Sequence, residues 1–213
     1  MGHPPASVEA PGDRLLSEVL RNDVVAECLA RLPGLALPNW YLGAGCLAQS
    51  VWNRAHSRPV AADILDYDVV YFDDDLSERS ENEAGELVRQ LLADLPVKAD
   101  VKYQARVHLW YTSRFGYAIQ PYTSCEDAIS TWPTTATAVG VRRLQNAGFL
   151  LCAPFGVDDL LALNVRPNRV QITPAIYAAK VERWRSAWPR LRIFPWEDGV
   201  GEPGLRRVVL EGP

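Results

Sequence analysis

The chain has 213 residues, of which 48% are hydrophobic and 23% are charged, and its formal net charge is -4 at pH 7. This composition is typical of a globular protein of one large or two small domains, and it disfavours bulk nucleic-acid binding, which usually leaves a basic excess. The composition does not exclude local basic patches. There is no apolar run long enough to span a membrane, and residues 1–13 lack the basic and apolar regions of a signal peptide.

The four cysteines are scattered along the chain without any C-x-x-C pair, so a zinc site built from them is not expected. Free thiols without an export signal are typical of a reducing compartment. We therefore expect a cytoplasmic protein with no membrane association.

Residues 1–13 are expected to form a flexible N-terminus. Hydrophobic periodicity then predicts alternating helices and strands. Their expected order is helix 14–31, strand 40–45 running into a glycine turn, helix 46–56, strand 64–72, helix 81–96, strand 99–104 and helix 105–116. Asn22 or Asp23 is expected to break or cap the first helix, and Gly116 to end the last.

Beyond Gly116 the pattern predicts a helix opened by Ser124, a β-hairpin within 138–156, and two further helices, at 157–165 and 174–191. The expected fold class is α/β (α+β), with a small mixed sheet, flanking helices and a mostly helical C-terminal part packed on them.

We expect one domain over 14–195, with its core at 38–116 and the mostly helical part at 117–195. Residues 196–213 lose the pattern and are expected to be a peripheral tail.

The stretch "LDYDVVYFDDD", residues 65–75, carries the strongest chemical signal. Asp66 and Asp68 are two residues apart in a predicted strand, so both side chains point to the same face. Two neighbouring carboxylates repel each other unless a cation lies between them, and magnesium prefers such hard oxygen ligands and often bridges them to substrate phosphates. The alternative is a solvent-facing strand edge.

A glycine turn at Gly43 and Gly45 lies between a predicted strand and a predicted helix. Such a turn lets backbone amides approach a phosphate at the helix N-terminus. In the predicted strand 99–104, Asp100 is the candidate third carboxylate for two-metal phosphoryl transfer; the alternative is an exposed aspartate at a strand start.

Other polar residues have two interpretations each. Arg106 is a candidate triphosphate ligand, because guanidinium binds phosphate bidentately, or else the partner of a nearby acid. Lys180 could reach a phosphate, although the charges around it on a predicted helix favour a solvated face.

Several stretches together resemble a bacterial family of nucleotidyltransferase-like proteins within the DNA polymerase beta-like nucleotidyltransferase superfamily. The resemblance covers roughly residues 15–192. It rests on "LGAGCLAQSVWN", "LDYDVVYFDDDLS", "QARVHLWY", "PYTSCEDAISTWPTTATAVGVR", "APFGVDDLL", "VRPN" and "YAAKVERWRSAWPRL".

The resemblance implies transfer of a nucleoside monophosphate from a nucleoside triphosphate to an acceptor, with release of pyrophosphate. It implies magnesium, with two ions possible, held by Asp66 and Asp68, while Asp100 is the candidate for activating the acceptor. The nucleotide is expected at Gly43, Gly45, Cys46, Gln49 and Arg106. A small-molecule acceptor is favoured over protein or RNA.

The sequence departs from the superfamily pattern at one important position. Cys46 stands where serine often follows the glycine to touch a phosphate, and a thiol is a poor hydrogen-bonding substitute. The alternative function is therefore a catalytically inactive module of the same fold that binds a nucleotide or a partner.

Overall fold

The structure is a computed structural model that describes residues 10–204 and 207–212. The described residues form a six-stranded mixed sheet in the order β3-β2-β1-β4-β5-β8, in which β2 and β3 are parallel and the other neighbours are antiparallel. The strands are β1 (Tyr41–Gly43), β2 (Tyr67–Tyr71), β3 (Ala99–Tyr103), β4 (Gly140–Arg143), β5 (Phe149–Cys152) and β8 (Arg207–Leu210).

One face of the sheet carries the larger core. The helices that pack there are α1 (Pro11–Val19), α2 (Asp23–Arg31), α3 (Gly45–Ala55) and α4 (Glu78–Leu91). Strand β2 alternates as expected, because Tyr67, Val69 and Tyr71 enter this core while Asp68 faces the other way. The Asn22 side chain caps α2 by accepting hydrogen bonds from Val24 N–H and Val25 N–H.

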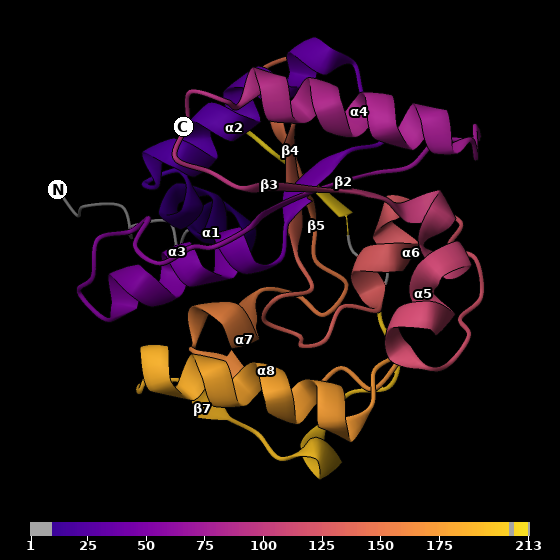
Figure 1. The fold of residues 1–213 in the computed structure, drawn as a ribbon. Helices are drawn as coiled ribbons and strands as arrows, with labels where there is room; N and C mark the ends of the chain where they lie inside the picture. Colours follow the sequence, from indigo (N-terminus) through magenta and orange to yellow (C-terminus); the bar gives the residue numbers. More distant parts are fainter. Residues whose placement is uncertain (1–9, 205–206, 213) are drawn as a thin grey trace, which may run out of the picture.

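The opposite face of the sheet is covered over its central strands. The helix α6 (Cys125–Ser130) packs there, with Ile129 and the nearby Trp132 against the sheet. Glycines at register partners Gly43 and Gly140 make this approach possible, since an added Cβ would come within 2.9 Å of a Trp132 ring carbon and of Ile129 Cδ1 respectively. The α5 helix (Val107–Phe115) lies beside α6 (Figure 1).

The C-terminal part adds α7 (Asp158–Leu161), α8 (Pro174–Ala187) and a second small sheet of β6 (Asn164–Val165) and β7 (Arg192–Ile193). Three tryptophans fix α8 to α3, because Trp184 and Trp188 both pack edge-on against Trp52. Trp188 also donates its ring N–H to Asn53 Oδ1 at 2.8 Å. In Figure 1, α8 lies along the lower edge of the molecule, and α4 lies along the upper edge.

The 3-10 turns complete the described chain; they are η1 (Leu32–Leu35), η2 (Gln104–Arg106) and η3 (Trp196–Asp198). Within the described part of the chain, none of the helices combines the length and the apolar character that crossing a bilayer requires. All four cysteines are buried and free.

The expected mixed sheet with flanking helices is confirmed, but two boundaries were wrong. Residues 196–213 are not a peripheral tail, because β8 pairs with β5 and extends the main sheet. The strand is short and mostly exposed, so its hydrophobic pattern is too weak to stand out from the glycines and prolines before it. Residues 11–13, expected to be flexible, begin α1, with Pro11 in its first turn; residues 1–9 lie outside the described residues.

Candidate active site

Three aspartates gather at one end of the parallel strand pair. Asp68 and Asp100 are the second residues of β2 and β3, and they are direct register partners. Register partners on adjacent strands point to the same face of the sheet. Asp66 stands two residues before Asp68, immediately ahead of the strand. The structure therefore places Asp68 and Asp100 side by side on one face, with Asp66 just ahead of Asp68 in the chain.

Lysines accompany the two outer carboxylates. Lys98 Nζ lies 3.0 Å from Asp66 Oδ1, and Lys102 Nζ forms an ion pair with Asp100. Both pairs are partly exposed to solvent. Among the residues that the structure describes, no cluster of three or more histidine, cysteine, aspartate or glutamate side chains is arranged to hold a metal ion.

Asp68 differs from its neighbours in its electrostatic surroundings. Burial and the nearby Asp100 charge raise the pKa of its carboxyl to about 6, while Lys102 and Lys180 act in the opposite direction. Among the described side chains, none forms an ion pair with Asp68. The negative charge at this position is therefore costly, and a bound cation would relieve that cost.

Lys180 of α8 is close enough to act on Asp68, although the sequence favoured a solvated face for it over contact with a phosphate. Its side chain is half-buried and its ammonium lies 5.8 Å from the centre of the Trp184 ring. Burial and the Arg183 charge lower its pKa, and Asp68 partly offsets this. Within the described chain no carboxylate lies within ion-pair distance of it. The signal was its position beside Tyr177, Val181 and Trp184, which form the buried face of α8.

The glycine turn connects the carboxylates to a helix N-terminus. Gly43 ends β1 as the register partner of Asp68, and α3 begins at Gly45. The N-cap residue of α3 is Ala44, with a φ of 55°, and no side chain caps this helix. A helix N-terminus without a side-chain cap is the kind of position that suits a phosphate. The end of the Gln49 side chain lies over Gly45, 2.8 Å from where a Cβ would be.

Two nucleotide-binding assignments need correction. Cys46 is fully buried and its thiol donates to the Gly43 carbonyl at 3.2 Å, so its side chain points into the core, away from the turn surface. Burial, followed by the Asp68 charge, raises its pKa well above the usual value. Gly43 is also enclosed, because a Cβ there would lie 2.7 Å from the Val139 carbonyl. Among the residues of the turn, only Gly45 and the first backbone amides of α3 remain as candidates for phosphate binding.

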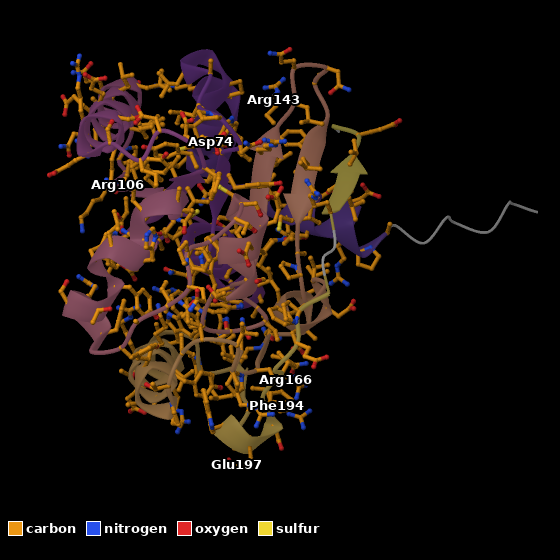
Figure 2. The ribbon with its side chains drawn as sticks, turned by 90° about the vertical axis from the view of Figure 1, so that its right-hand side faces the viewer. Asp74, Arg106, Arg143, Arg166, Phe194 and Glu197 are labelled. Carbon is orange, nitrogen blue, oxygen red and sulfur yellow. The ribbon has the colours of Figure 1, made fainter. Side chains whose placement is uncertain are left out.

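Arg106 is not a free triphosphate ligand. Its Nε lies 2.7 Å from Glu81 Oε2, its Nη1 donates to the Leu76 carbonyl, and its side chain is only 16% exposed. It follows the C-terminal end of β3, whereas Asp68 and Asp100 lie near the N-terminal ends of their strands. Figure 2 shows Arg106 in the upper part of the molecule, below Asp74. The competing expectation, pairing with a nearby acid, is the one the structure shows.

A sequence model described as nucleotidyltransferase matches residues 30–193. The chain belongs to this nucleotidyltransferase family. A solved structure described as revealing a CCA-adding enzyme head domain has the same fold, with a TM-score of 0.67 and 25% sequence identity over 86% of this chain and 95% of the other. No curated protein matches the sequence significantly. The protein is thus a nucleotidyltransferase that takes a nucleoside triphosphate as substrate.

Proposed function

We propose that this nucleotidyltransferase transfers a nucleoside monophosphate to an acceptor, with magnesium held by Asp66 and Asp68 and with Asp100 beside them. The observation that carries the proposal is the register pairing of Asp68 with Asp100, which sets carboxylates from two strands beside the N-terminus of α3. An anionic site of this kind next to an uncapped helix N-terminus suits a metal–triphosphate complex.

The chemical type of these side chains suits magnesium. They offer carboxylate oxygens, which are the ligands that magnesium prefers, and the Asp68 carboxyl lacks an ion-pair partner. The raised pKa of Asp68 reflects a charge that burial and Asp100 disfavour. When bound there, magnesium would neutralise charge on the phosphates and polarise the α-phosphate.

In the reaction, the acceptor oxygen forms a bond to the α-phosphorus. The bond from the α-phosphorus to the oxygen that bridges to the β-phosphate breaks, and pyrophosphate leaves with that electron pair. Asp100 is suitably placed to take the acceptor proton, because it lies beside Asp68 at the same face. Lys180 supplies a positive charge near Asp68, and the N-terminal amides of α3 hold phosphate oxygens.

The second candidate is a module that binds a nucleotide without chemistry. The ion pairs of Lys98 with Asp66 and of Lys102 with Asp100 favour it, because they already neutralise two of the three carboxylates. The two candidates differ in one observable: only the enzyme releases pyrophosphate.

The test is thermal melting with each of the four ribonucleoside triphosphates, with and without magnesium. We expect one or more nucleotides to raise Tm by about 5–10 °C at a hundredfold excess over Kd, only when magnesium is present. The variant Asp66→Asn/Asp68→Asn should lose the shift. The control Asp74→Asn/Glu197→Gln removes two exposed acids that lie far apart in Figure 2 and should keep it.

A shift that survives in Asp66→Asn/Asp68→Asn, or no shift with any nucleotide, would contradict the proposed site. A magnesium-dependent shift without pyrophosphate release from any acceptor mixture would select the binding module. Cytoplasmic location stays a prediction.

A further inference from the structure

Trp132 lies beside Asp68 on the face of the sheet that carries the carboxylates. A Cβ placed on Gly43 would lie 2.9 Å from two carbons of the Trp132 ring, Cη2 and Cζ3. Gly43 is the register partner of Asp68, and side chains at partner positions point to the same face with their Cβ atoms about 5 Å apart. The Trp132 ring therefore fills the side-chain position next to Asp68, which glycine at residue 43 leaves empty.

Asp68 has a different neighbour on each side along this face. On β3 its partner is Asp100, the candidate for activating the acceptor, and on β1 its partner is Gly43, over which Trp132 lies. Gly43 is two residues from Gly45, where α3 begins and where the phosphates are expected. Trp132 is consequently on the nucleotide side of Asp68, opposite the acceptor side.

The Trp132 side chain is suited to contact a ligand. It stays partly exposed, unlike Trp52, Trp184 and Trp188, which are buried where α8 packs on α3. No described residue accepts a hydrogen bond from its ring N–H, whereas Trp188 donates its ring N–H to Asn53. Because every nucleobase has a flat π face, an aromatic ring next to a metal–phosphate site suits a base.

The backbone around Trp132 is held in place by Asn168. The Asn168 side chain is fully buried, and its Nδ2 donates to the carbonyls of Ser130 and Trp132 at 2.7 and 2.8 Å. Its backbone N–H donates to the Pro133 carbonyl at 3.0 Å. The stretches "STWPTTAT" and "VRPN" thus meet to fix this loop. A ring on a fixed loop loses little freedom when a ligand binds, which favours affinity.

We propose that Trp132 is the platform on which the base of the nucleoside triphosphate stacks, while Asp66, Asp68 and the N-terminus of α3 bind the metal and the phosphates. The inference rests on the proposed function, since it names the residue that receives the base at the same site. Stacking tolerates every base, so Trp132 favours triphosphates that carry a base over bare polyphosphate, rather than one base over another.

The test compares the magnesium complexes of ATP, GTP, CTP and UTP with magnesium–tripolyphosphate, which has the phosphates and lacks the base. Isothermal titration calorimetry measures Kd for each ligand. The wild type should bind at least one nucleotide about tenfold or more tightly than it binds tripolyphosphate.

Two substitutions separate the aromatic ring from the bulk of the side chain. Trp132→Leu keeps an apolar group over Gly43 and should weaken nucleotide binding about tenfold or more, while tripolyphosphate binding stays within about twofold of the wild type. Trp132→Phe keeps a smaller ring and should give an intermediate nucleotide affinity. If Trp132→Leu does not fold, the Trp132→Phe variant decides, because its nucleotide affinity must still fall and its tripolyphosphate affinity must not.

The matched control is Trp196→Leu. Trp196 is a partly exposed tryptophan of η3 that lies beside Tyr177 of α8. The next residue, Glu197, is at the lower end of the molecule in Figure 2. This variant should bind every ligand as the wild type does.

Equal weakening of nucleotide and tripolyphosphate in Trp132→Leu would overturn the proposal, because the ring would then act on the metal–phosphate part by shielding Asp68 from water. Unchanged nucleotide binding in Trp132→Leu would overturn it too. In both cases the proposed function stands, since the wild type binds magnesium–nucleotide. If the wild type binds neither nucleotide nor tripolyphosphate, the proposed function fails, and the assignment of the base to Trp132 fails with it.

Discussion

Asp68 of β2 and Asp100 of β3 are register partners across a parallel strand pair, with no residue between them. Burial makes the Asp68 carboxyl costly to charge, and the Asp100 charge adds to that cost. Structures that only needed a stable strand pair would not place two acids opposite each other. The pairing therefore lowers the stability of the folded protein, and this cost can be measured.

Protonation of Asp68 should appear in the pH dependence of stability. Its pKa is about 6 in the folded protein and 3.8 is the ordinary value, so the folded state binds more protons between these pH values. Its contribution to the free energy of unfolding therefore falls as pH rises from about 4 to 6. In magnesium-free buffer at pH 8, Asp68→Asn should stabilise the protein by about 1–3 kcal/mol, and by much less at pH 4.

Urea unfolding at several pH values checks this. Asp100→Asn should move the Asp68 transition to lower pH, because one neighbouring negative charge is removed. Asp74→Asn, an exposed acid in a turn, serves as the control and should leave the pH profile unchanged. An Asp68→Asn variant that is less stable than wild type at pH 8 would show that the carboxylate is stabilised by contacts in the folded protein.

Lys180 should act on the nucleotide rather than on the fold. Lys180→Met should raise the KM for nucleoside triphosphate by about tenfold, because a half-buried cation near the expected phosphates is lost. Its Tm should stay equal or rise slightly, since the charge is already disfavoured by burial. Lys180→Arg should restore part of the affinity, and Arg79→Met should change neither quantity. A drop in Tm with unchanged KM would instead give Lys180 a packing role against Trp184.

The two glycines of the turn should respond differently to alanine. At Gly43 the added Cβ meets a backbone carbonyl and the Trp132 ring, which cannot move easily, so Gly43→Ala should cost about 3 kcal/mol. At Gly45 it meets the flexible end of Gln49, so Gly45→Ala should cost less than about 1 kcal/mol. Gly34→Ala, which meets no atom within 4 Å, is the control. Equal losses at Gly43 and Gly34, by chemical denaturation, would rule out the close packing described at β1.

The last strand should contribute to stability despite its position near the chain end. Leu210 is 5% exposed and belongs to the main core, whereas Val209 is 65% exposed on the same strand. Leu210→Ala should therefore lower the free energy of unfolding by about 2–4 kcal/mol, and Val209→Ala by less than about 0.5 kcal/mol. Similar small effects for both substitutions would mean that β8 does not stay paired in solution.

Local signals in the sequence were sufficient for most elements. The alternation in β2, the helical spacing of α1 to α4, the Asn22 and Ser124 caps and the turn between β4 and β5 all depend on residues a few positions apart. The common face of Asp66 and Asp68 follows from the same period of two. Signals of this range are weakest for β8, whose four residues are mostly exposed.

What the sequence by itself determined was therefore the mixed α/β architecture, the carboxylate strand and the glycine turn, since neighbouring residues encode all three. The tertiary structure alone decided which distant residues meet. Strand register set Asp100 beside Asp68, and the packing of α8 on α3 brought Lys180 near Asp68. Arg106, beyond the far end of β3, pairs with Glu81. Burial turned Cys46 inward. These outcomes depend on packing between segments far apart in the chain, and a short-range hydrophobic pattern does not encode such packing.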